Sequence, residues 1–409
     1  MQKYSLDKKK IKVLLLEGIH ENAVKYFEEN GYTNIDYHKK ALDEKDLIKV
    51  IKGTHIVGIR SRTQLTSEVL KSARKLFSVG CYSIGTNQVD LGFAKMNGIP
   101  VFNAPFSNTR SVAELVIAEC IMLMRGISTK NVLAHEGKWK KTARNSYEIR
   151  GKNLGIVGYG HIGTQVSILA EALGMKVFYH DIEKKLNIGN ATPCSSLDEL
   201  LDIADIVTLH VPSTDLTRNM INDSTIARMK KGSFLVNASR GDVVDYSAVA
   251  KALDEGRLLG IAADVFPEEP ASEKEQFHSV LQQKENVILT PHIGGSTTEA
   301  QANIGLEVSE KLVTYSDNGS TVGATNFVEV NLSPNHNKQR FFHIHRNVPG
   351  VLREVNYIFT SKGINIASEY LQTDAQIGYV IIDTESTLGK DVLKELKGIK
   401  HTIRARMLY

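Results

Sequence analysis

The chain has 409 residues, 42% of them hydrophobic and 23% charged, a composition typical of a soluble globular protein with two or three domains. Its 50 basic and 46 acidic side chains leave a net charge of +4, which is too small to indicate nucleic-acid binding. Three widely spaced cysteines predict neither disulfides nor a metal site, and no apolar run is long enough to cross a membrane. Because the polar N-terminal segment also lacks the apolar core of a signal peptide, we expect a cytoplasmic protein that binds neither metal nor membrane.

Short apolar runs alternate with amphipathic stretches over residues 1–107. This pattern predicts strands at 11–16, 34–37, 55–59, 76–81 and 101–102, and helices at 21–28, 44–52, 67–73 and 91–96. Such alternation is typical of an α/β protein with a doubly wound parallel sheet.

A second strand–helix series follows a long apolar helix that is expected from Asn108 to Gly126. A loop through Trp139 and Lys141 separates this helix from the series. The predicted strands are 154–157, 177–179, 206–211, 234–237, 259–265 and 287–290, and the predicted helices are 162–173, 222–229 and 246–254.

The first turn of this second series contains three spaced glycines. Gly158 permits a tight turn out of the strand, Gly160 lets backbone approach a pyrophosphate, and Gly163 lets the helix pack closely on the sheet. Asp181, at the end of the next strand, can accept hydrogen bonds from ribose hydroxyls and would repel a 2′-phosphate. The glycines, their strand and helix, and the acid together predict dinucleotide binding, with NAD favoured over NADP.

The C-terminal part of the chain predicts a third domain. A helix at about 297–315 follows the last strand of the second series and can return to the first domain. Residues 318–339 have the composition of a linker, and the remainder has the strand and helix order βαββαβ of ferredoxin-like domains. We therefore predict a discontinuous doubly wound domain (1–107 and 296–336), a Rossmann domain (108–295) and a ferredoxin-like domain (337–409).

Three polar residues follow the carboxyl ends of strands in the second series, where ligands of open α/β sheets bind. His292 has the pKa range of a general base, and Glu269 can fix its tautomer and stabilise the imidazolium. Arg240 offers a bidentate fork for a carboxylate. Together with a dinucleotide, these residues suit the oxidation of a 2-hydroxy acid.

Three segments resemble the signatures of the D-isomer-specific 2-hydroxyacid dehydrogenases, namely 158–163, 237–241 and 290–295. The similarity covers nearly the whole chain and implies that Arg240, Glu269 and His292 form the catalytic set. The glycine motif and the resemblance imply cofactor contacts at Gly158, Gly160, His161, Ile162, Gly163, Asp181, Ala238, Ser239, Arg240, Asp264, His292, Ile293, Gly294 and Gly295.

Within this family, residues 60–66, 85–90 and 103–111 are most similar to members that oxidise 3-phospho-D-glycerate in L-serine synthesis. The resemblance implies that Arg60, Ser61 and Arg62 bind the substrate phosphate, since two guanidinium groups and a hydroxyl suit that group. Asn108, at the start of the long helix, is expected to cap it and to contact the substrate carboxylate. Lys141 is expected to add charge from a neighbouring subunit.

The C-terminal module resembles an ACT domain, a regulatory module that pairs across subunits. The resemblance implies that His345, Asn347 and Asn365 bind L-serine as a feedback inhibitor, and that the enzyme is a homotetramer.

Several alternatives remain open at this stage. The arginine-rich segment can be a solvated basic loop, Lys141 an isolated surface charge, and the C-terminal residues an ordinary polar loop. The chain can also be a dehydrogenase of another acid, such as glycerate or lactate, or a non-enzymatic NAD-sensing protein on the same fold.

Overall fold

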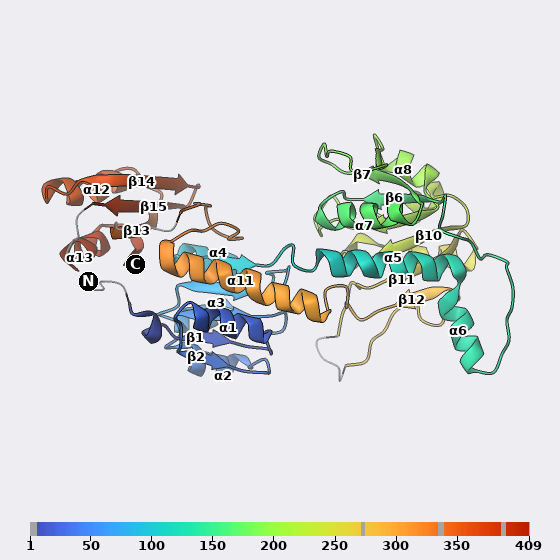
Figure 1. Cartoon of the computed structure of the whole chain (residues 1–409), viewed down its shortest axis with the longest axis horizontal. Coiled ribbons are helices and arrows are strands. Elements are labelled where there is room, and N and C mark those ends of the chain that lie inside the picture. The colour runs from blue at the N-terminus through green and yellow to red at the C-terminus, as the bar shows by residue number, and fades with distance from the viewer. Residues whose placement is uncertain (1–5, 271–274, 334–338, 386–389, 409) are drawn as a thin grey trace. The chain divides into compact units, whose positions relative to one another are not determined.

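The computed structural model describes residues 6–270, 275–333, 339–385 and 390–408 (Figure 1). The chain forms two compact units, residues 1–107 with 301–409 (unit 1) and residues 108–300 (unit 2). Among the described residues, no helix combines the length and the apolar character needed to cross a membrane.

Unit 1 begins with a five-stranded parallel sheet in the order β2-β1-β3-β4-β5. Its strands are β1 (Val13–Leu15), β2 (Ile35–Tyr37), β3 (Ile56–Ile59), β4 (Ser78–Cys81) and β5 (Val101–Asn103). The strand order reverses between β1 and β3, so the carboxyl ends of these two strands flank a switch point of the kind at which α/β sheets bind ligands.

Helices cover both faces of this sheet, because alternate strand residues are apolar on both sides. Val13 and Leu15 of β1 face one core, and Leu14 and Leu16 face the other. The first core also contains residues of α1 (Glu21–Glu29) and α11 (Thr298–Asn318), and the second contains residues of α2 (Glu44–Ile51), α3 (Ser67–Ser72) and α4 (Leu91–Met96). The predicted doubly wound domain is confirmed, including the return of a late helix to it.

The C-terminal part of unit 1 forms a four-stranded antiparallel sheet in the order β14-β15-β13-β16. Its elements are β13 (Gln339–Arg346), α12 (Val351–Ser361), β14 (Ile366–Thr373), β15 (Ile377–Thr384), α13 (Lys390–Gly398) and β16 (Thr402–Met407). The two helices bury one face of this sheet. This is the ferredoxin-like order that the sequence predicts.

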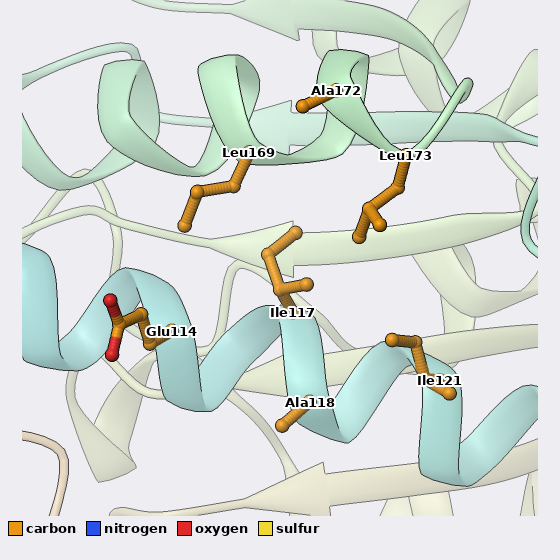
Figure 2. A pocket seen from close by; sticks show the side chains of 7 residues that line it. All are labelled: Glu114, Ile117, Ala118, Ile121, Leu169, Ala172 and Leu173. Carbon is orange, nitrogen blue, oxygen red and sulfur yellow. The ribbon is translucent and has the colours of Figure 1, made fainter.

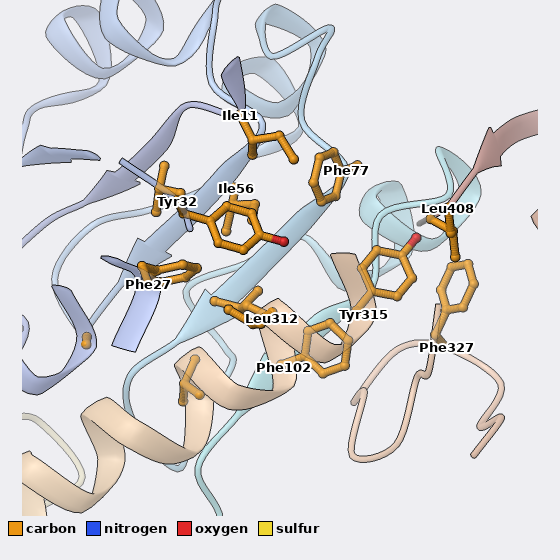
Figure 3. Packing of buried hydrophobic residues seen from close by; sticks show 14 of the residues in the cluster. Ile11, Phe27, Tyr32, Ile56, Phe77, Phe102, Leu312, Tyr315, Phe327 and Leu408 are labelled. Atoms are coloured by element: carbon orange, nitrogen blue, oxygen red, sulfur yellow. The ribbon is translucent and has the colours of Figure 1, made fainter. Parts of the chain in front are cut away.

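The other face of the antiparallel sheet joins the core of the parallel sheet. The ring of Tyr315, near the end of α11, lies 5.8 Å from that of Phe102 (Figure 3). It also lies 6.0 Å from the ring of Phe342 in β13. Arg340 pairs with Asp383 through hydrogen bonds of 2.7 and 2.8 Å and also donates to the carbonyl of Asn318. The two sheets of unit 1 therefore share one continuous core.

Unit 2 contains a seven-stranded parallel sheet in the order β12-β11-β10-β9-β6-β7-β8. The strands are β6 (Asn153–Val157), β7 (Lys176–His180), β8 (Thr192–Pro193), β9 (Ile206–Leu209), β10 (Ser233–Asn237), β11 (Leu258–Ala263) and β12 (Val287–Leu289). Helices α5 (Thr109–Arg125) and α7 (His161–Ala172) cover one face, and α8 (Leu197–Ile203), α9 (Asp223–Arg228) and α10 (Tyr246–Asp254) cover the other. This is a Rossmann-type arrangement, as predicted.

Two helices of unit 2 were not predicted. Helix α6 (Ile127–His135) buries none of its residues, so its sequence lacks the apolar periodicity that marks a helix. Helix α8 is too short to show a clear apolar period. Ser196 does cap it, by accepting a hydrogen bond from the backbone N–H of Glu199, but this capping signal was not recognised in the sequence. Trp139 and Lys141 lie in the loop that follows α6, as expected.

Candidate active site

The glycine turn after β6 has the geometry that the motif predicts. Gly158 has a φ of +92°, and a Cβ atom there would lie 2.4 Å from the carbonyl oxygen of His210. A Cβ atom at Gly163 would lie 2.3 Å from the Gly158 carbonyl oxygen, whereas one at Gly160 would meet nothing within 4 Å. Two glycines are therefore required by the protein's own packing, and the third borders open space.

That open space lies at the N-terminus of α7. Gly160 is the N-cap residue and provides no side-chain cap, and His161 and Ile162 begin the helix. A helix N-terminus with an open approach suits the negative charge of a pyrophosphate. These residues fit a dinucleotide.

Asp181 is held at the end of β7, on the other side of the turn. Its carboxylate accepts hydrogen bonds from the backbone N–H groups of Tyr159, at 2.8 Å, and Glu183, at 2.9 Å. The ring of Tyr159, in the glycine turn, stacks on that of Tyr179 in β7 with centroids 3.8 Å apart, and this contact holds the turn against the strand. The half-buried carboxylate of Asp181 retains acceptor capacity for hydroxyl groups.

Asp264 anchors the loop that follows β12. It is almost fully buried, and its carboxylate accepts hydrogen bonds from the Thr290 hydroxyl at 2.5 Å and from the N–H groups of Ile293 and Gly294 at 2.8 Å. The sequence had indicated Asp264 only as a cofactor contact, and the structure adds this anchoring function. The loop that carries His292 is therefore fixed by a buried charge.

Asn237 organises the turn that carries Arg240, although it was not among the site residues predicted from the sequence. Its side-chain amide donates hydrogen bonds to the Arg240 carbonyl and the Tyr246 hydroxyl, both at 3.0 Å. The side-chain oxygen of Asn237, Oδ1, accepts hydrogen bonds from the N–H and the hydroxyl of Ser239. The Arg240 guanidinium in turn donates to the Ser239 carbonyl at 2.6 Å. Ala238 and Ser239 thus lie in a turn whose backbone is held from within.

His292 and Glu269 form a hydrogen-bonded pair. Nδ1 of His292 lies 2.8 Å from Oε2 and 3.1 Å from Oε1 of Glu269. The backbone of His292 has a φ of +53°, an uncommon conformation for a residue other than glycine and one that often marks a functional site. The N–H of Phe266 also donates to Glu269, which orients the carboxylate.

The interaction between His292 and Glu269 shifts the pKa values of both side chains. The hydrogen bond to Glu269 raises the pKa of His292, against the opposing effects of burial and of the Arg240 charge. Burial raises the pKa of Glu269, but the hydrogen bond and charge of His292, with a contribution from Arg240, leave that pKa below its usual value. A histidine that is held in one tautomer by a carboxylate can accept a proton, and the nearby arginine can bind an anion.

A second buried acid, Glu119, lies in α5 near Asp264. Burial, with a smaller contribution from the Asp264 charge, raises the pKa of Glu119 to about 8. Neither carboxylate oxygen has a hydrogen-bond partner among the described residues. Glu119 is therefore neutral at pH 7 in the folded protein.

The predicted substrate residues are divided between the two units. Arg60, Ser61 and Arg62 follow β3 in unit 1, and neither guanidinium group is hydrogen-bonded or ion-paired within the described ranges. In unit 2, Lys141 is exposed. The predicted side-chain cap by Asn108 is wrong, because Asn108 occupies the N-cap position of α5 but makes no capping hydrogen bond. Its buried Oδ1 has no partner among the residues described.

The predicted effector residues have different environments. His345 is buried in β13, where its ring stacks on that of His343 with a distance of 3.3 Å between the Nδ1 atoms. Burial lowers the pKa of His345, which favours the neutral form of this ring. Asn347 and Asn365 are exposed, and their amides donate to the Asp374 carbonyl and the Glu385 carboxylate. No hydrogen bond joins these three residues within the described part of unit 1.

An apolar groove lies between α5 and α7, away from the polar residues above. Leu169 of α7 and Leu173, which follows that helix, point toward α5, where Ile117 and Ile121 line the groove (Figure 2). The groove has a volume of about 320 Å³, and Glu114 is the charged residue among those that line it. Its chemistry suits an apolar surface contact better than a polar ligand.

Comparisons with known proteins agree with this geometry. Residues 117–294 match the model of the D-isomer specific 2-hydroxyacid dehydrogenase NAD binding domain, and residues 341–404 match an AHAS small subunit-like ACT domain. D-3-phosphoglycerate dehydrogenase from Haemophilus influenzae is 56% identical over 407 residues, covering 100% of this chain and 99% of that protein. The enzyme of the same name from Escherichia coli strain K12 is 56% identical over 411 residues and covers 100% of both chains.

A solved structure shares the fold of most of the chain. D-lactate dehydrogenase from Aquifex aeolicus, complexed with NAD and lactic acid, is 28% identical, with a TM-score of 0.64, and the match covers 74% of this chain and 95% of that one. The full-length similarity, the NAD-binding domain and the ACT domain agree with one another. The chain therefore belongs to the D-isomer-specific 2-hydroxyacid dehydrogenase family, in its D-3-phosphoglycerate dehydrogenase branch.

Proposed function

We propose that this enzyme uses NAD to oxidise 3-phospho-D-glycerate to 3-phosphooxypyruvate, the first step of L-serine biosynthesis. The observation that carries the proposal is the His292–Glu269 pair beside Arg240 in the dinucleotide-binding unit. The two relatives that are 56% identical bear the name of this activity.

The reacting groups have separate tasks in the proposed reaction. His292 takes the proton of the C2 hydroxyl, and Glu269 stabilises the imidazolium that results. Arg240 binds the substrate carboxylate and, in the reverse direction, polarises the C2 carbonyl. NAD, bound by the glycine turn, the start of α7 and Asp181, supplies the acceptor for the two electrons that leave C2.

The proposed cofactor contacts extend from the glycine turn to both catalytic loops. They are Gly158, Gly160, His161, Ile162, Gly163, Asp181, Ala238, Ser239, Arg240, Asp264, His292, Ile293, Gly294 and Gly295. Open space at Gly160 supports the pyrophosphate contact. The anchoring of residues 293 and 294 by Asp264 supports a rigid wall near the reacting atoms.

We propose that Arg60, Ser61 and Arg62 bind the phosphate of the substrate. Two guanidinium groups that have no hydrogen-bond or ion-pair partner among the described residues lie at the switch point of a doubly wound sheet, and this supports an anion site there. Asn108 is proposed to contact the substrate carboxylate, to which the NH₂ group of its buried side chain can donate a hydrogen bond. Lys141 is proposed to act from a neighbouring subunit.

We propose that residues 337–409 form a regulatory domain that binds L-serine through His345, Asn347 and Asn365. Residues 1–107 with 296–336 would form the substrate domain, and residues 108–295 the NAD domain. The match to an ACT domain over residues 341–404 supports this division. A neutral His345 suits a hydrogen bond to an amino acid, since its ring nitrogens can then donate and accept.

A cytoplasmic homotetramer is the assembly that we propose. The apolar groove of Figure 2, the exposed Trp139 (87%) and the exposed Tyr357 (69%) in α12 support subunit contacts in both units. The buried, unpaired cysteines Cys81, Cys120 and Cys194 support a reducing compartment.

The test is NADH absorbance during turnover of 3-phosphooxypyruvate, with and without L-serine. We expect NADH consumption that L-serine suppresses. Consumption that saturating L-serine leaves unchanged would contradict the regulatory proposal but not the catalytic one. In protein shown to bind NADH, the absence of consumption would contradict the substrate and favour another 2-oxo acid or a non-enzymatic NAD-sensing function.

A further inference from the structure

Glu17 lies next to the basic loop at the switch point of the parallel sheet in unit 1. It follows β1, and the loop Arg60–Thr63 follows the neighbouring strand β3. The side chain of Glu17 is buried, with a residue exposure of 9%. A buried acid beside a basic loop requires an explanation, because burying a charge is unfavourable unless it is hydrogen-bonded.

The carboxylate of Glu17 accepts three hydrogen bonds from the backbone of that loop. Oε1 accepts from the N–H of Arg60 at 3.1 Å and from the N–H of Thr63 at 2.9 Å. Oε2 accepts from the N–H of Arg62 at 2.9 Å. One side chain therefore binds nearly every backbone donor of the loop and fixes the shape of its main chain.

The backbone of Glu17 is itself held in an unfavourable conformation. Its φ of +64° lies in the left-handed region, which costs a residue other than glycine or asparagine about 1 kcal/mol. The N–H of Glu17 donates to the Lys40 carbonyl at 3.3 Å, and that of Gly18 donates to the His38 carbonyl at 3.0 Å. These bonds keep the carboxylate pointed at the loop.

Gln88 holds the same loop by donating a hydrogen bond to one of its carbonyl groups. Its buried side-chain amide donates to the Arg60 carbonyl at 2.6 Å and to the Ser83 hydroxyl at 3.1 Å. The loop is thus fixed by a carboxylate that binds its N–H groups and an amide that binds a carbonyl group.

The Glu17 carboxylate leaves the arginine side chains available. Within the described residues, neither guanidinium group pairs with an acidic side chain, and the hydrogen bonds of the Glu17 carboxylate to the loop all come from backbone N–H groups. We infer that Glu17 is a positioning residue, which fixes the backbone from which Arg60 and Arg62 bind the substrate phosphate. This inference depends on the phosphate site proposed above.

The test is the variant Glu17→Gln, assayed by reduction of 3-phosphooxypyruvate and of hydroxypyruvate, the same 2-oxo acid without the phosphate. A glutamine side chain places an NH₂ group where Oε2 now accepts, so at least one loop N–H loses its acceptor. We expect KM for the phosphorylated substrate to rise about tenfold or more, with a smaller change in kcat and in both constants for hydroxypyruvate. Gln88→Met should give the same selective change, and it serves if Glu17→Gln fails to fold.

The matched control is Asp317→Asn, which also removes a charge that binds two groups in unit 1, Lys8 and the Tyr32 hydroxyl. Arg60→Ala and Arg62→Ala test the phosphate site independently. If the arginine variants affect only the phosphorylated substrate while Glu17→Gln resembles Asp317→Asn, the inference about Glu17 is wrong and the phosphate site stands. If the arginine variants weaken both substrates equally, the phosphate site is wrong and the inference fails with it. Equal losses on both substrates in Glu17→Gln alone would reduce Glu17 to a structural residue.

Discussion

Replacement of Glu119 by glutamine should make the stability of the protein less sensitive to alkaline pH. Glu119 lies in the middle of α5 with 1% of its surface exposed, and burial raises its pKa from 4.5 to about 8. In the folded protein it carries a proton at pH 7, whereas in the unfolded chain it has lost that proton.

The sign and size of the effect follow from the two pKa values. A raised pKa in the folded state contributes stability that is lost as the pH rises through that pKa, because the folded state must then accept a buried charge. Between pH 7 and pH 9 this loss is about 1.4 kcal/mol for a group whose folded pKa is about 8. Glutamine has the shape of the protonated acid and does not titrate, so Glu119→Gln should escape the loss.

Urea unfolding of the full chain, followed by circular dichroism at pH 7 and pH 9, measures the difference. Other titrating groups are common to both proteins, so their contributions cancel when the variants are compared. Glu114→Gln is the matched control, because Glu114 lies on the same helix but is exposed. If wild type and Glu119→Gln lose stability in parallel between these pH values, the assignment of a buried neutral carboxyl is refuted.

Two further predictions concern the catalytic pair and the glycine turn. Glu269→Gln should move the acidic limb of the pH profile of kcat/KM for oxidation to lower pH, because the neutral form of His292 is the proposed base and Glu269 raises the pKa of His292. A limb at an unchanged pH would contradict this. Gly163→Ala should destabilise the fold by several kcal/mol, since its Cβ atom would lie 2.3 Å from a carbonyl oxygen. Gly160→Ala should keep the thermal midpoint, because Gly160 has a φ of −84° and its Cβ atom would enter open space. The same variant should weaken NADH binding, measured by a fluorescence titration.

The sequence predicted the architecture well because the signal was local and repeated. Short apolar runs separated by helical stretches define parallel sheets, and the glycine turn at 158–163 fixes which sheet binds the dinucleotide. Helix α6 escaped prediction because it buries no residue and so has no apolar face. The side-chain cap at Asn108 was predicted wrongly, since the residue type favours capping but its side chain makes no capping hydrogen bond in the fold.

The supporting residues of the site could not be found from local pattern. Glu17 reaches loop residues that are 43 to 46 positions away in the chain, and Asp264 reaches residues 26 to 30 positions away. A single acid after a strand is common in any α/β sequence, and only the fold brings it to the loop that it holds. The proposed catalytic residues could therefore be named from the sequence, whereas the residues that hold their loops could not.

The positioning residues share one chemical feature, which explains why they are acids. Glu17 accepts three backbone donors, and Asp264 accepts two backbone donors and a hydroxyl. A carboxylate has two oxygens that only accept, whereas an amide of the same shape places a donor against one of these N–H groups. Each acid therefore satisfies several backbone N–H groups of one loop that would otherwise lack these partners. It does so without occupying the arginine or histidine side chain that is proposed to bind the substrate. Substitution by the isosteric amide is for this reason the most informative change at these positions, since it preserves the volume and removes only the acceptor.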